Sequence, residues 1–73
     1  MKEKLKKQFP QIAEDIEEYW EDECRNAFLL GCFDRVYGSR HPRRGKFIRV
    51  LDSMPDAFTL KHGFKLEDWA QKL

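Results

Sequence analysis

The side chains best suited to nucleophilic or metal chemistry in this chain are Cys24, Cys32, His41 and His62. A structural zinc site needs four ligands, and its cysteines are typically spaced C-x₂₋₄-C. The two cysteines are eight positions apart, and the two histidines lie in separate segments. We therefore expect no metal site, and we interpret both thiols as small apolar side chains of the core.

The sequence also lacks the patterns that are typical of nucleophilic catalysis. Ser39 and Ser53 lack the G-x-S-x-G context of a nucleophile elbow, and neither cysteine has a histidine close in sequence. The four glycines are scattered, so they do not predict a phosphate-binding loop. We expect a protein that has no enzymatic activity and no cofactor.

Charge is polarised along the chain although the net charge is only +1. Seven of the 13 acidic residues fall within 14–23, and residues 35–49 contain six Lys or Arg and no acid. A ridge of carboxylates and a basic segment can each attract an oppositely charged partner. The residues that we expect to bind a protein partner are Glu14, Glu18, Glu21, Arg40, Arg43 and Arg44. The alternative is that the two runs neutralise each other, within one chain or across a dimer.

Nucleic-acid binding is a second interpretation of the basic segment, because arginine side chains suit phosphates. The phosphate-binding residues would be Arg40, Arg43, Arg44, Lys46 and Arg49. The stretch 58–69 also resembles a helix-turn-helix, with Gly63 in the turn. Two observations count against this interpretation. The net charge is near zero, and Glu67 and Asp68 would face the phosphates at the start of the second helix.

The strongest secondary-structure signal predicts one long helix from Pro10 to Tyr37, ended by Gly38 as a left-handed cap. One apolar stripe comprises Ile12, Ile16, Tyr19, Trp20, Ala27 and Leu30. A second stripe, rotated by more than 90°, comprises Leu29, Cys32, Phe33 and Val36. Glu23 projects into the first stripe, so its carboxylate should be paired or lie near an edge of the stripe. Since one stripe can pack on later helices, the other should find a second copy of the chain.

Shorter helices are predicted after the loop that begins at Gly38. The apolar residues Phe47, Val50, Leu51 and Met54 have helical spacing, although residues 46–50 also permit a short strand. Helical spacing returns in Leu66, Trp69, Ala70 and Leu73. The fold class is therefore mainly α, a small bundle of one long N-terminal helix and two or three short ones. Trp20 and Trp69 are the expected core anchors.

These patterns predict a single domain over residues 1–73, with residues 1–9 a lysine-rich N-terminus that can fray. No apolar run approaches the roughly 18–20 residues of a membrane-spanning helix, and no secretory signal is visible. Two thiols without such a signal suit a reducing, cytoplasmic location. We expect a small non-enzymatic protein-interaction or regulatory module, a homodimer of the size of many bacterial or phage accessory proteins. The alternative is a DNA-binding transcriptional regulator.

Overall fold

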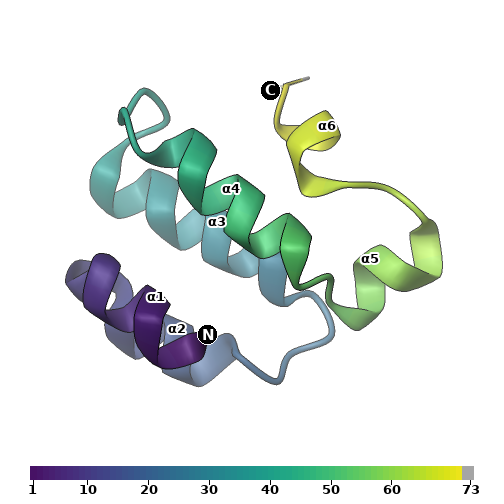
Figure 1. The fold of residues 1–73 in the computed structure, drawn as a ribbon, viewed down its shortest axis with the longest axis horizontal. Helices are drawn as coiled ribbons and strands as arrows, with labels where there is room; N and C mark the ends of the chain where they lie inside the picture. The colour runs from purple at the N-terminus through teal and green to yellow at the C-terminus, as the bar shows by residue number, and fades with distance from the viewer. Residues whose placement is uncertain (72–73) are drawn as a thin grey trace.

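The computed structural model describes residues 1–71, and within them the chain is helical without a strand. Helices α3 and α4 run side by side at the centre, with α1 and α2 on one side and α5 and α6 on the other (Figure 1). The elements are α1 (Lys2–Gln8), a 3₁₀ turn (Pro10–Ile12), α2 (Ala13–Tyr19), α3 (Arg25–Tyr37), α4 (Arg44–Ser53), α5 (Ala57–His62) and α6 (Leu66–Ala70). The all-α class is thus confirmed.

The predicted single helix from Pro10 to Tyr37 is wrong, because the chain breaks between α2 and α3. The amide of Asp22 donates to the carbonyl of Tyr19, and its carboxylate accepts from the Cys24 amide at 2.8 Å. These bonds close a turn at residues 20–24 and start a new helix at Arg25. No glycine or proline marks this break, so helical periodicity alone did not reveal it.

The break lets most of both apolar stripes reach the same core, while Ala27 of the first and Val36 of the second stay exposed. A continuous helix would keep them more than 90° apart, whereas α2 and α3 each turn their own apolar face inward. Ile12 and Ile16 from the first stripe are buried together with Leu29 and Phe33 from the second. A second chain is therefore not required to cover either stripe.

Residues 1–9 belong to the core and do not form a frayed end. Helix α1 buries Leu5, and Phe9 follows it into the centre of the molecule. The ring of Phe9 meets Phe33 and Phe47 edge-on, with ring centroids 5.5 and 5.0 Å apart. Lys2 and Lys6 both form salt bridges with Glu17, which fasten α1 to α2.

Phenylalanines, and not the two tryptophans, anchor the core. Phe33 and Phe47 stack with their ring centroids 4.8 Å apart, and both are fully buried. Trp20 is only partly buried, and Trp69 is 41% exposed. Trp20 lies in the turn between α2 and α3 and packs against the edge of the core.

Helix α4 includes residues 46–50, so the helical alternative for this segment is confirmed over the strand. Between α3 and α4, Gly38 adopts a φ of +92°, which favours glycine, but its ψ of 152° lies outside the left-handed helical region. Arg44 then binds Asp34 through two nitrogens at 2.8 and 3.1 Å. This bidentate pair joins the end of α3 to the start of α4.

The two C-terminal helices are short and are held by carboxylates. Asp52 of α4 accepts from the amides of Leu66 and Glu67 at 2.8 and 3.1 Å, so it caps α6 from another helix. Gly63 ends α5 in the left-handed region, as a turn between two helices requires. The predicted helical spacing near the C-terminus holds for Leu66 to Ala70, whereas Leu73 lies outside the described residues.

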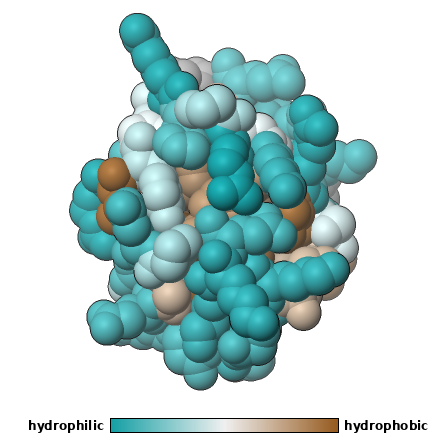
Figure 2. Space-filling model, turned by 60° about the vertical axis from the view of Figure 1, so that its left-hand side comes forward, coloured by the Kyte–Doolittle hydropathy of each residue, from teal (hydrophilic) through white to brown (hydrophobic). Residues whose placement is uncertain are grey.

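The surface is mostly polar on the face where the loop between α3 and α4 comes forward (Figure 2). Hydrophobic side chains appear there only as small separate areas. Among residues 1–71, no helix has the length and apolar character needed to cross a membrane.

Candidate functional site

The acidic residues predicted to bind a partner are exposed. Glu14 and Glu18 border a shallow depression between α1 and α2, whereas Glu21 lies in the turn that follows α2. Within residues 1–71, none of the three forms a salt bridge or a side-chain hydrogen bond. Glu23 is exposed in the same turn, so the expectation of a carboxylate within the apolar stripe is wrong.

The basic segment divides into structural and exposed side chains. Arg43 donates to the carbonyl of Gln8 at 3.3 Å and stacks over the ring of Phe9 at 4.7 Å. Arg44 is engaged by Asp34, and hydrogen bonding to this carboxylate raises the pKa of the guanidinium. The remaining predicted phosphate ligands, Arg40, Lys46 and Arg49, are exposed.

The structure does not bring the acidic run and the basic segment together as a whole. Among residues 1–71, the one salt bridge between them joins Asp15 to Arg35 at 3.2 Å. Glu17 pairs instead with α1, and Arg44 with Asp34 outside the acidic run. Ion pairs between the two runs therefore neutralise only a small part of their charge.

Cys24 is partly buried and Cys32 is buried. Burial raises the pKa of both thiols, which disfavours the nucleophilic thiolate. His41 packs edge-on against Phe33, and its Nδ1 accepts from the Arg43 amide. In the part of the chain that the structure describes, no three His, Cys, Asp or Glu residues are grouped for a metal ion.

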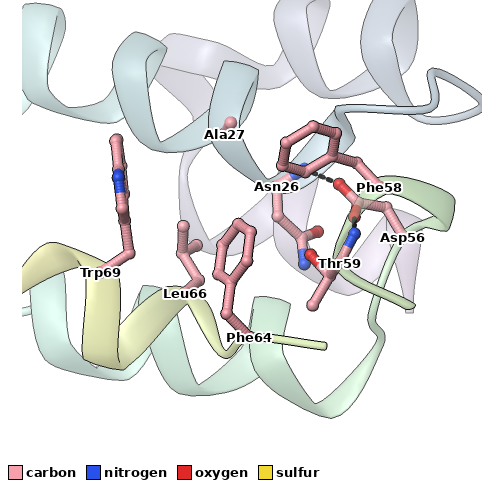
Figure 3. Close-up of a pocket in the computed structure, with 8 residues that line it drawn as sticks. All are labelled: Asn26, Ala27, Asp56, Phe58, Thr59, Phe64, Leu66 and Trp69. Atoms are coloured by element: carbon pink, nitrogen blue, oxygen red, sulfur yellow. Dashed lines mark hydrogen bonds between the residues drawn. The ribbon is translucent and has the colours of Figure 1, made fainter. Parts of the chain in front are cut away.

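An apolar pocket of about 290 Å³ lies between the first turn of α3 and the two C-terminal helices (Figure 3). Its apolar walls are formed by Ala27, Phe58, Phe64, Leu66 and Trp69. Figure 3 shows Phe64, Leu66 and Trp69 on the side of α6, facing the part of α3 that carries Ala27. The rings of Phe58 and Phe64 meet edge-on at 5.7 Å.

Three buried polar residues, Asn26, Asp56 and Thr59, also line this pocket, and internal hydrogen bonds occupy the side chains of Asn26 and Asp56. The Asp56 carboxylate accepts hydrogen bonds from the backbone amides of Asn26 and Thr59, at 2.7 and 2.8 Å. The Asn26 side chain donates to the carbonyl of Leu51 and accepts from Arg25. Across residues 1–71, no buried side-chain nitrogen or oxygen lacks a partner.

The carboxyl of Asp56 is held in its charged form. Burial raises its pKa, but the hydrogen bonds from Asn26 and Thr59 and the nearby charge of Arg25 outweigh burial, so the net pKa is lowered. A carboxylate that accepts two amides has little capacity left for a ligand. The pocket therefore offers mainly apolar contacts, and the Asp56 carboxylate is not free to bind a polar ligand.

Helical periodicity did not identify this pocket. It placed Trp69 in a C-terminal helical stripe and treated it as a core residue, whereas Trp69 is a partly exposed wall of the pocket. The two short helices with Gly63 between them do form, as the helix-turn-helix likeness implies. The second helix, however, has only five residues, and the Asp52 carboxylate already caps its first amides.

No protein-family model, no curated protein and no solved structure matches this chain.

Proposed function

We propose that this chain is a non-enzymatic protein-interaction module that holds one large apolar side chain of a partner in the pocket between α3, α5 and α6. The observation that carries this proposal is the composition of the pocket. Its walls are apolar and aromatic, while internal hydrogen bonds occupy the side chains of Asn26 and Asp56, which also line it. Binding hot spots are commonly single aromatic or aliphatic anchors seated in such pockets.

The size of the pocket supports a single anchor. About 290 Å³ lies just below the range of roughly 300–1,000 Å³ typical of sites for drug-sized ligands and cofactors. Filling this space would place the partner against Trp69, which is 41% exposed. Burial of apolar surface contributes about 25 cal/mol per Å², so covering this ring and its neighbours would supply much of the affinity.

The exposed acids would assist this binding from a distance. Glu14, Glu18 and Glu21 are not engaged within residues 1–71, so they can attract a basic partner and raise its association rate. Of the proposed basic contacts, Arg40 is free to reach a partner, whereas Arg43 and Arg44 serve the fold. The same engagement weakens the nucleic-acid alternative, because it removes two of its five proposed phosphate ligands.

Selection of peptides on the immobilised full-length protein tests the proposal. We expect the selected peptides to share one large apolar residue, and replacing that residue by Ala should weaken binding at least tenfold. Ala27→Glu places a carboxylate at the pocket, at a position in the first turn of α3 where an acid suits the helix. It should weaken the same peptides at least tenfold.

Leu60→Glu is the matched control, since Leu60 is 70% exposed but does not line the pocket. Its binding should stay within twofold of that of the original chain. The proposal is overturned if no peptide binds more tightly than about 100 µM, or if the peptides bind the Ala27→Glu and Leu60→Glu variants equally well.

A further inference from the structure

An exposed aromatic ring of this chain lies beside the pocket. Phe28 is 44% exposed in the first turn of α3, next to Ala27, which lines the pocket. Successive residues of a helix are 100° apart, and Gly31 falls between Ala27 and Phe28 on the same exposed face. The pocket and the Phe28 ring therefore flank one exposed strip of α3.

We infer that the occupant of the pocket is the Phe28 ring of a second copy of this chain. This inference rests on the proposed function, because it names the partner of the same pocket. A two-fold axis along the exposed strip of α3 brings Phe28 of each copy to the pocket of the other. Such an interface is self-complementary, as an isologous dimer requires.

The chemistry of the ring fits that of the pocket. A phenyl ring carries no hydrogen-bonding atom, and the buried polar groups of the pocket need none. An apolar cavity of about 150 Å³ already accepts benzene, so about 290 Å³ has room for a phenyl group and its methylene. Phe58, Phe64 and Trp69 offer aromatic surfaces around it, and edge-to-face contacts between rings are favourable.

Part of each flank carries exposed charges of opposite sign. The flank of Phe28 adjoins α2, because its ring lies 5.2 Å from that of Tyr19, and this side carries the exposed Glu18 and Glu21. The opposite flank carries the exposed Lys61 and Lys65 beside Phe64, together with the exposed Glu67 and Asp68 of α6. A second copy seated on the pocket can bring its Glu18 and Glu21 toward the two lysines, which favours the side of the pocket formed by Phe64.

The strip between the two flanks permits close approach. A Cβ added at Gly31 would meet no atom within 4 Å, so the backbone of α3 is open to a neighbour there. The net charge of +1 also imposes little repulsion between two copies.

Sedimentation equilibrium of the full-length chain tests this inference. Between 10 and roughly 200 µM we expect a concentration-dependent shift from the 8.8-kDa chain toward twice that mass. Phe28→Ser should weaken dimerisation at least tenfold. Val36→Ser is the control, because Val36 is 40% exposed on the same helix but does not line the pocket, and it should dimerise like the original chain. Circular dichroism confirms that each variant is folded.

An isotope-filtered NOE experiment on a mixture of labelled and unlabelled chains locates the contact. We expect cross-peaks between the Phe28 ring of one copy and Trp69 or Phe64 of the other. A chain that stays monomeric at 200 µM, or equal weakening by Phe28→Ser and Val36→Ser, overturns the dimer. If peptides still bind in a manner that Ala27→Glu abolishes, the protein-interaction function stands without it. If a Phe28-dependent dimer is indifferent to Ala27→Glu, Phe28 does not occupy the pocket and this inference fails. The proposed function fails only if peptide binding is also indifferent to Ala27→Glu.

Discussion

The backbone amide of Asn26 donates a 2.7-Å hydrogen bond to the carboxylate of Asp56, which lies thirty residues further along the chain. The other oxygen of this carboxylate accepts from the Thr59 amide, so one buried side chain caps the starts of both α3 and α5. Arg25 adds a hydrogen bond to the carbonyl of Met54 at the end of α4. Three helix ends thus meet at one polar junction, and this junction forms a wall of the pocket.

Removing the Asp56 carboxylate should destabilise the fold. A lost helix cap costs about 0.5–2 kcal/mol, and an unsatisfied buried amide costs about 1–3 kcal/mol. We therefore expect Asp56→Ala to lower the free energy of unfolding by roughly 2–4 kcal/mol, and Asp56→Asn by less, since its amide oxygen can still accept one bond. Urea denaturation followed by circular dichroism measures both. A loss below about 0.5 kcal/mol for Asp56→Ala would contradict the double cap.

The stability that Asp56 contributes should depend on pH. Its pKa in the folded chain is lowered, so its contribution is present above the unfolded value of about 3.9 and is lost as the pH falls through the lower folded value. The difference in stability between the original chain and Asp56→Asn should therefore be constant near neutral pH and shrink below about pH 4. Urea titrations at several pH values would show this. A difference that grows on acidification would contradict a lowered pKa of Asp56 in the folded chain.

Residues 1–9 should be required for folding. Phe9 packs on Phe33 and Phe47, and replacing a buried phenylalanine by Ala typically costs about 3–5 kcal/mol. A core in a chain of about this size rarely supplies more than about 3–5 kcal/mol of stability, so Phe9→Ala should leave the chain largely unfolded at 37 °C. Thermal melts check this. A truncated chain that begins at Pro10 and melts like the full chain would restore the interpretation of a frayed terminus.

The exposed acidic ridge should matter to association and not to folding. The acidic run 14–23 concentrates like charges, and neither Glu18 nor Glu21 has an ion-pair partner among residues 1–71. Glu18→Gln together with Glu21→Gln should therefore leave the melting temperature unchanged or slightly raised, and should slow association with a basic partner. Glu17→Gln is the contrasting variant, because Glu17 pairs with two lysines and its pKa is lowered by them. A clear loss of stability in the double variant would show that the ridge serves the fold.

The arginines of the basic segment should separate into two groups. Arg44 is largely covered and binds Asp34 through two nitrogens, so Arg44→Ala should cost roughly 1–3 kcal/mol of stability. Arg49 is exposed, and Arg49→Ala should change stability by no more than about 0.5 kcal/mol. Binding of duplex DNA should be weak at about 0.15 M salt. Submicromolar binding there, lost in Arg40→Ala and Arg49→Ala, would favour the DNA-binding alternative.

The sequence by itself determined the helical class and most of the apolar faces. The spacing of Phe47, Val50 and Leu51 predicted α4, and Ile12 and Ile16 were correctly placed on an inward face. These successes share a cause, since helical periodicity is a local property that depends only on which residues lie three or four positions apart.

The tertiary structure alone decided where the first helix breaks, which aromatic rings form the core and where a pocket remains. The start of α3 depends on Asp56 as well as on the local turn at Asp22, and the start of α6 depends on Asp52, so a carboxylate distant in sequence acts at each of these helix ends. The burial of Phe9 depends on Phe33 and Phe47, and the exposure of Trp69 depends on how α6 packs on α4. Hydrogen bonds and packing between distant segments leave no periodic trace along the chain, so no local pattern could have predicted them.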